Sequence, residues 1–321
     1  MKKREFDYLS ADGKTRIHAV EWRPDGEPSG VLQIVHGMAE YADRYSPFAA
    51  YLAEKGILVT GQDHLGHGKS VGEDHPYGYF CHENAPDVLV EDVRSLYLQQ
   101  RGSWPQLPYV MLGHSMGSFI LRNYLCRYGE GLDGAVIMGT GMQPEKLLDF
   151  SLKLVRLLTL LQGERHKSGL VNMLAFGSYN RKISHPVSAM DWLSRDEKEV
   201  AKYNADPLCG FTFTLNGFAT LFTLIRRLHD PERLGGMPKD LPVLLVSGEK
   251  DPVGDYGKAV RQVYDSFLRM GMHGVSMKLY EDDRHELINE ADRKEVWEQL
   301  YGWISQRMPE EGRQQEGKAC S

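Results

Sequence analysis

Short runs of apolar residues recur along the chain and are separated by stretches with a helical repeat of apolar positions. Continuous short runs are typical of strands buried on both faces of a sheet, whereas a repeat of about three to four residues predicts amphipathic helices. Near the N-terminus, alternation of apolar and polar residues in RIHAVEWRP predicts a hairpin over residues 5–23. We predict the later strands at 31–35, 57–60, 109–112, 135–138, 243–247 and 275–280.

Helical patterns follow most of the predicted strands. They cover residues 44–55, 86–100, 256–270 and 290–307, and a further one begins after residue 115. Buried strands that alternate with helices predict an α/β fold, in which a mostly parallel sheet carries helices on both faces. We assign residues 1–140 and 230–308 to this core.

Residues 141–229 interrupt the alternation, because they carry only helical signals. The first helical stretch has a wide apolar arc and a narrow polar stripe of Asp149, Lys153 and Arg156, so most of its surface must be covered. An insertion at this point is predicted to lie over the carboxyl edge of the sheet, where open α/β sheets bind ligands. We therefore expect a helical cap at 141–229, and a solvated tail at 309–321.

Composition narrows the class of protein. The formal net charge is −6 without a basic block, so nucleic acid is not an expected partner. The start MKKREFDYLSADG has no apolar run behind its basic residues, and no stretch reaches the roughly 18 apolar residues of a membrane span. The four cysteines lack CxxC spacing, which argues against a zinc knuckle and a disulfide framework. We expect a cytoplasmic globular protein.

The run Gly113-His114-Ser115-Met116-Gly117 lies between a predicted strand and a predicted helix. A G-x-S-x-G in that position is the pattern of a nucleophile elbow, in which a strained turn lifts the serine above the sheet edge. The glycines leave room for strand and helix to approach closely. We predict that Ser115 is a catalytic nucleophile.

A serine nucleophile needs a base and an acid that orients the base. With this elbow the chain order is Ser, then Asp or Glu, then His. Asp251 follows the strand predicted at 243–247, and His285 follows the strand predicted at 275–280. We predict that Asp251 and His285 complete a triad with Ser115, and Asp255 is the alternative acid.

The oxyanion hole should use the amide that follows the nucleophile and a second amide from the loop after an earlier strand. The first is that of Met116. Met38, which follows His36-Gly37, is the natural second donor, although Met-Ala-Glu stands here in place of the further glycines of the lipase HGGG pattern.

Other histidines suggest different chemistry but fit it poorly. The sequence that begins at His285 does not match the zinc-protease motif, because Asn289 stands where the second histidine ligand would be. His64 and His67 are expected to be structural and to tie their loop beneath the elbow. We predict neither a metal ion nor a cofactor.

Five motifs, taken in order, carry a resemblance to a known family. They are His36-Gly37-Met38 with Arg44-Tyr45, Asp63-His64-Leu65-Gly66-His67-Gly68-Lys69-Ser70, Gly113-His114-Ser115-Met116-Gly117, Gly248-Glu249-Lys250-Asp251-Pro252-Val253 and Arg284-His285-Glu286. Over residues 10–305 the chain resembles the α/β-hydrolase fold family, and within it the monoacylglycerol lipase and lysophospholipase branch, which also includes members similar to serine aminopeptidases.

That resemblance implies acyl transfer to a serine and then to water. Ser115 would attack an ester carbonyl, His285 would take its proton, and Asp251 would orient the imidazole. The amides of Met38 and Met116 would bind the oxyanion. The implied substrate is a single-chain lipid ester, such as a monoglyceride or a lysophospholipid.

The predicted cap is expected to select the substrate. Its first helix offers apolar side chains that either line an acyl-chain tunnel, touch a membrane or micelle, or simply pack the cap onto the core. They are Leu147, Leu148, Phe150, Leu154, Leu157 and Leu158. Leu154 and Leu158 are the candidates for substrate contact, and the sequence is silent on oligomeric state.

Alternative functions stay open. A small-ester carboxylesterase would have the same motifs. A serine aminopeptidase would need a cap carboxylate for the substrate amine, and Asp149, Glu164, Asp191 and Asp196 are available. A non-catalytic binding scaffold of the same fold is the remote alternative, since all three triad residues are present.

Overall fold

The computed structural model describes residues 1–308, so the tail predicted at 309–321 lies outside the described residues. One sheet of eight strands crosses this part of the chain, in the order β1-β2-β4-β3-β5-β6-β7-β8. The strands are β1 Lys2–Leu9, β2 Arg16–Arg23, β3 Gly30–Val35, β4 Ile57–Gln62, β5 Tyr109–His114, β6 Gly134–Met138, β7 Val243–Gly248 and β8 Val275–Tyr280. The pair β1–β2 and the pair β2–β4 are antiparallel, and the other pairs are parallel.

The central strands are continuous apolar runs because both of their faces are covered. Every residue of β3 to β7 is buried. In contrast, β8 pairs only with β7 at the sheet edge, and its side chains alternate between partly buried and exposed. The strand predicted at 275–280 is therefore present, but it is an edge strand and is not buried on both faces.

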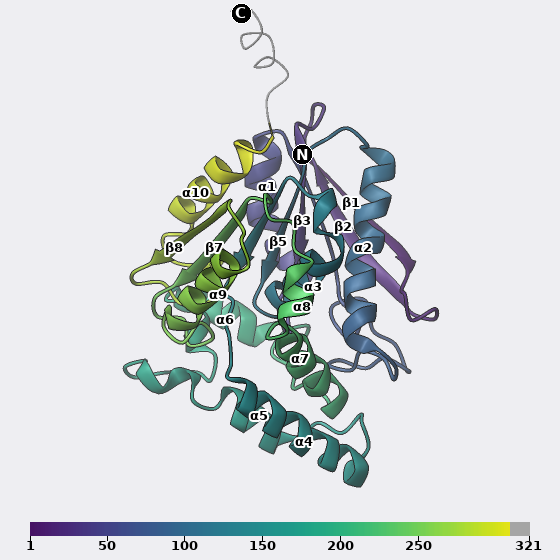
Figure 1. Ribbon diagram of the computed structural model, residues 1–321, viewed down its shortest axis with the longest axis vertical. Helices are drawn as coiled ribbons and strands as arrows, with labels where there is room; N and C mark the ends of the chain where they lie inside the picture. Colours follow the sequence, from purple (N-terminus) through teal and green to yellow (C-terminus); the bar gives the residue numbers. More distant parts are fainter. Residues whose placement is uncertain (309–321) are drawn as a thin grey trace, which may run out of the picture.

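Helices cover the sheet on both faces, as Figure 1 shows. One face packs against α1 (Ser46–Glu54) and α10 (Arg293–Ser305), and the other against α2 (Ala85–Ser103), α3 (Met116–Tyr128) and α9 (Lys258–Arg269). The helix predicted at 290–307 corresponds to α10, which begins at Arg293 and is preceded by a 3₁₀ turn, Leu287–Asn289. The predicted α/β fold class is confirmed.

The segment 141–229 contains no strand and carries α4 (Glu145–Gln162), α5 (Gly169–Phe176), α6 (Glu197–Ala205) and α7 (Leu215–Arg227). In Figure 1, α4 and α5 lie at one end of the molecule, away from the sheet. Helix α7 packs against α4 and also against α2 and α3 of the core. Within residues 1–308, no helix is both long enough and apolar enough to cross a membrane.

Candidate active site

Ser115 occupies the turn between β5 and α3 with φ 52° and ψ −119°, a backbone conformation that residues other than glycine rarely adopt. Hydrogen bonds to neighbouring residues hold this turn in place. The Ser115 amide donates to the Met138 carbonyl at 3.0 Å, and the Ser118 hydroxyl donates to the Ser115 carbonyl at 2.6 Å. These bonds hold the strained serine in one position, which is what a nucleophile elbow requires.

Two glycines let the loop after β3 approach this turn. A Cβ on Gly117 would lie 1.9 Å from the Val35 carbonyl oxygen, which no rearrangement of side chains relieves. A Cβ on Gly37 would lie 3.0 Å from the Ser115 Cβ. The backbone of residues 37–38 therefore passes directly beside the candidate nucleophile.

The two amides predicted for the oxyanion hole lie at this junction. Met116 is the first residue of α3, so its N–H has no acceptor within the helix. Among residues 1–308, the Met38 N–H donates no hydrogen bond. Both residues line the same cavity as Ser115, so two amide donors are available beside the serine.

The candidate base and acid meet in the loops that follow β8 and β7. His285 Nδ1 lies 2.9 Å from Asp251 Oδ2, and both side chains are almost completely buried. Asp251 also accepts hydrogen bonds from the Val253 amide at 2.8 Å and from the Ser247 hydroxyl at 3.2 Å. The alternative acid, Asp255, is exposed and pairs with Lys258, so the geometry favours Asp251.

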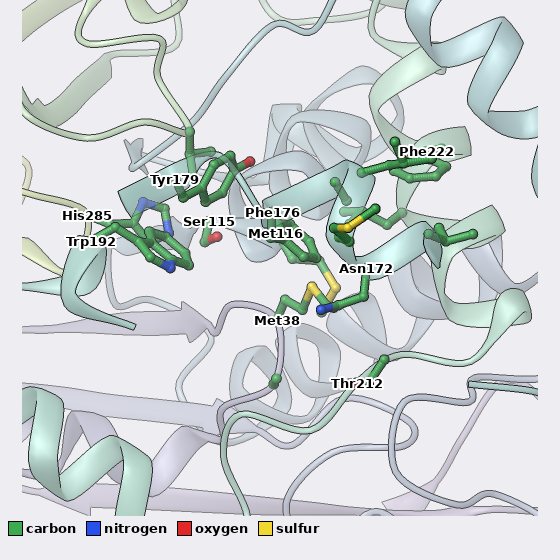
Figure 2. Close-up of a pocket in the computed structure, with 18 of the residues that line it drawn as sticks. Met38, Ser115, Met116, Asn172, Phe176, Tyr179, Trp192, Thr212, Phe222 and His285 are labelled. Carbon is green, nitrogen blue, oxygen red and sulfur yellow. The ribbon is translucent and has the colours of Figure 1, made fainter. Parts of the chain in front are cut away.

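Ser115 and His285 line one cavity of about 440 Å³. In the view of Figure 2, the Ser115 side chain lies between the His285 ring and the Met116 side chain. On the side of Ser115 away from His285, the cavity is lined mainly by apolar side chains, among them Phe176 and Phe222, together with the polar Asn172 and Thr212. A cavity of this kind can hold an apolar chain while one of its ends reaches the serine.

Some of the α4 residues predicted to contact substrate line this cavity, and others do not. Leu147, Leu148, Phe150 and Leu154 of α4 line it, together with residues of α5 and α7. Leu158 is partly buried and packs against the core cluster without lining the cavity. Leu154 and Leu158 are one helical turn apart and differ in this respect.

A short segment of the inserted region contacts the candidate base, and no pattern in the sequence indicated this contact. Residues 191–195, here called the cap strap, place the Trp192 ring 5.0 Å from the His285 ring, centroid to centroid. The Glu286 amide donates to the Leu193 carbonyl at 2.7 Å, and Arg284 Nη1 donates to the Asp191 carbonyl at 2.6 Å. The cap strap is therefore bonded to the loop that carries His285.

A buried charge cluster, also missed from the sequence, lies between the loop after β3 and the loop after β8. It consists of Glu40, Arg44, His114 and Glu286. Arg44 binds both oxygens of Glu286 at 2.7 and 2.8 Å and one oxygen of Glu40 at 2.8 Å. His114 Nδ1 lies 3.0 Å from the other oxygen of Glu40, so each acid faces a cation.

The charges in this cluster stabilise one another against the cost of burial. Burial favours the neutral form of Glu40, but the hydrogen bond and charge of His114, together with Arg44, hold the pKa of the Glu40 carboxyl well below its ordinary value. Burial likewise opposes the His114 cation, yet the contact with Glu40 raises the pKa of that imidazole above its ordinary value. Both shifts favour the charged forms of Glu40 and His114.

Three further histidines pack near one another, His36 in the loop after β3 and His64 and His67 in the loop after β4. The rings of His36 and His64 are 4.2 Å apart, and His67 stacks on Phe80 at 5.7 Å. Burial, with the neighbouring His36 as a smaller cause, lowers the pKa of His67 to about 3. These rings are neutral packing groups, which agrees with the structural role expected for His64 and His67.

Comparison with known proteins places this arrangement among hydrolases. The family described as "Serine aminopeptidase, S33" (Hydrolase_4) matches residues 26–292. A monoacylglycerol lipase of Mycolicibacterium smegmatis is 32% identical over 294 residues, which cover 91% of this chain and 94% of the relative. A monoglyceride lipase of Homo sapiens is 28% identical over 309 residues, which cover 93% of this chain and 89% of the relative.

Solved structures agree with this assignment. A thermostable carboxyl esterase from Bacillus coagulans, determined in complex with glycerol, superposes with a TM-score of 0.88 at 30% identity. The alignment covers 96% of this chain and all of the esterase. A soluble variant of a Saccharomyces cerevisiae monoglyceride lipase superposes with a TM-score of 0.77 at 18% identity and shares the fold.

Proposed function

The chain belongs to the serine aminopeptidase S33 family of α/β hydrolases, and from that premise we propose that it hydrolyses carboxylic esters of single-chain lipids, a monoacylglycerol or a lysophospholipid. The observation that carries the proposal is the cavity, whose apolar walls lead to Ser115 and His285. In the proposed reaction Ser115 forms an acyl-enzyme, and residues 141–229 act as the cap that encloses the acyl chain.

The hydrogen bond between His285 and Asp251 defines the role of each group in this mechanism. Nδ1–H donates to Asp251, so Nε2 carries the lone pair that accepts the Ser115 proton as the hydroxyl attacks the ester carbonyl. The resulting imidazolium protonates the departing alcohol. In the second half of the reaction Nε2 accepts a proton from the water that attacks the acyl-enzyme. The imidazolium then returns this proton to the Ser115 oxygen as the bond to the acyl group breaks and the fatty acid is released.

The oxyanion that forms at each step needs donors already in place. The amides of Met38 and Met116 are the proposed donors, because neither is engaged elsewhere among residues 1–308 and both line the cavity at Ser115. Loss of one such donor costs about 3–4 kcal/mol of transition-state stabilisation in enzymes of this mechanism.

The aminopeptidase alternative requires a carboxylate that is available to the substrate amine. Of residues 1–308, two carboxylates line the cavity, Glu40 and Glu286, and Arg44 binds both. The four cap carboxylates considered from the sequence bond to other groups outside the cavity: Asp149 to Arg226, Glu164 to Tyr79, Asp191 to the Val187 amide and Asp196 to Arg293. This charge distribution favours an ester over an aminoacyl substrate.

A substrate panel tests the proposal. Purified protein is assayed with acetyl, medium-chain and long-chain monoacylglycerols, lysophosphatidylcholine and aminoacyl amides. We expect kcat/KM to rise with chain length among the monoacylglycerols, because each buried methylene adds about 0.8 kcal/mol. Turnover of the aminoacyl amides alone would contradict the lipid-ester proposal.

Two leucines on α4 form a matched pair for the same panel. Leu154→Gln introduces an amide into the cavity wall, and we expect kcat/KM for long-chain esters to fall at least about tenfold more than that for acetyl esters. Leu158→Gln changes a residue outside the wall and should affect long and short chains alike. If Leu154→Gln lowers kcat/KM equally for both chain lengths, Leu154 contributes to packing and does not contact the acyl chain.

We also propose transient contact of α4 and α5 with a membrane or micelle surface. Eight of the thirteen large apolar side chains exposed within residues 1–308 lie on these two helices. They are Leu147, Phe150, Leu157, Leu160, Leu161, Leu170, Met173 and Leu174. Some of them also line the cavity, so the exposed apolar surface leads directly into the cavity.

Substitution at the exposed end of α4 tests this contact. Leu160 and Leu161 are 80% and 72% exposed and lie outside the cavity wall. We expect the double variant Leu160→Ser/Leu161→Ser to bind phosphatidylcholine vesicles at least about tenfold more weakly in co-sedimentation, with unchanged turnover of a soluble acetyl ester. The control is Leu98→Ser on α2, and equal vesicle binding by all three proteins would disprove the contact.

A further inference from the structure

The buried charge cluster connects the two loops that the proposed chemistry brings together. At one end, Glu40 accepts a hydrogen bond of 2.6 Å from the Gly37 amide, immediately before Met38. At the other end, His114 Nε2 lies 3.3 Å from the carbonyl oxygen of His285, and Glu286 is the next residue along the chain. The loop after β3 and the loop that carries His285 are thus joined through charged side chains.

The partners of His114 determine its protonation state. Nδ1 faces a carboxylate oxygen of Glu40 and Nε2 faces a backbone carbonyl, and both of these groups only accept hydrogen bonds. A neutral imidazole donates from one nitrogen and would leave the other lone pair against an oxygen. Only the doubly protonated ring donates to both partners.

The other groups that face His114 are consistent with a cation. Tyr45 packs at its edge, with ring centroids 6.4 Å apart, and donates its hydroxyl to Glu40 at 3.0 Å. Glu286 contributes a favourable charge, whereas His36 is neutral because burial lowers its pKa. The His285 ring lies 4.7 Å away. In this cluster two carboxylates balance Arg44 and one imidazolium.

We propose that His114 is held as an imidazolium ion and that, with Glu40, it is a positioning residue that fixes the oxyanion loop relative to His285. This inference rests on the proposed ester hydrolysis. Burying four charges is expensive, and an apolar cluster of similar volume often stabilises a fold as well. A fixed geometry between an oxyanion donor and a general base is what such a cluster provides here, because it bonds to the backbone on both sides of the serine.

The protonation state can be read in the wild-type protein, whatever its activity. Histidine labelled with ¹⁵N gives two similar ring-nitrogen shifts when it is an imidazolium and two very different shifts when it is neutral. The His114 signals are those missing from the His114→Asn spectrum. We expect the imidazolium pattern at about pH 8, well above the ordinary histidine pKa. A neutral His114 at that pH overturns the proposal, even if the protein hydrolyses every ester in the panel.

The positioning role is tested with Glu40→Gln, which keeps the size of the side chain and removes its charge. We expect kcat for a monoacylglycerol to fall about 100-fold with KM within about twofold of the wild-type value, because the interactions lost act in the transition state. His114 should then show the neutral pattern. An unchanged kcat, or a rise in KM alone, overturns the positioning role.

A second buried glutamate serves as a matched control. Glu21 on β2 is 1% exposed and bonds to Arg23 and Gln100, away from the cavity. Glu21→Gln therefore reports the effect of neutralising a buried acid on the fold alone, and we expect its kcat to stay within about twofold of wild type. If Glu21→Gln and Glu40→Gln lower kcat equally, the effect belongs to general stability and the positioning proposal is wrong.

Discussion

Ser115→Ala is expected to lower kcat for monoacylglycerol hydrolysis by about a million-fold, since the acyl-enzyme can no longer form. The change removes one hydroxyl and leaves the backbone bond from the Ser115 amide to Met138, so the fold should persist. Steady-state kinetics measure the loss. A fluorophosphonate probe, followed by mass spectrometry of the digested protein, should place the adduct on Ser115 in the wild type and find none in the variant.

Ser118→Ala is the control for this experiment. Ser118 lies on α3 directly after the elbow, but its hydroxyl donates to the Ser115 carbonyl and lies 2.9 Å from the Thr140 hydroxyl oxygen. This variant should keep the fluorophosphonate adduct. Labelling that survives Ser115→Ala would identify a different nucleophile and would refute the acyl-enzyme mechanism proposed here.

Asp251→Asn is expected to lower kcat by about 10⁴-fold, because it imposes the wrong tautomer on His285. The Val253 amide donates to Oδ1 of Asp251, so the asparagine oxygen stays on that side and its NH₂ group faces His285. An NH₂ donor requires Nδ1 of His285 to accept. The proton then sits on Nε2, which can no longer take the proton of Ser115.

The exposed alternative acid provides the comparison for this variant. Asp255→Asn removes an exposed charge that pairs with Lys258 at 3.8 Å, and we expect kcat within about twofold of wild type. Both variants are compared by kcat and by thermal unfolding. Should Asp255→Asn prove inactive while Asp251→Asn keeps full activity, the acid would have been assigned to the wrong residue.

Much of the fold is visible in local sequence patterns. The buried strands are continuous apolar runs, and the elbow has glycines where any Cβ would strike the backbone, so both follow from short-range constraints. The loops that carry Asp251 and His285 follow strands of known direction, which is why their meeting could be predicted. The partial exposure of β8 could not be predicted, because it follows from β8 having only one neighbouring strand, which its own sequence does not reveal.

The contacts between distant loops left no local signal. Glu40, His114 and Glu286 are far apart in the chain, and a glutamate in a loop or a histidine at the end of a strand is expected to be solvated until the fold places a partner beside it. Leu154 and Leu158 show the same limit on a smaller scale. They share one helical face, and tertiary packing, such as that of α7 against α4, decides which of them lines the cavity.

The bonds of the cap strap distinguish two parts of the inserted region, which differ in how readily they can accept substitutions. Arg195 contacts the carboxylates of Asp283, Glu290 and Asp292, so the segment around Trp192 is held to the histidine loop from several directions. Among residues 1–308, α4 and α5 form no side-chain hydrogen bond or ion pair with that loop, and the acidic side chains of α4 pair with Arg226 and His229 instead. We therefore expect substitutions in α4 and α5 to change acyl-chain preference without moving His285, whereas a graft that exchanges the whole region for that of a relative should displace this proposed general base as well.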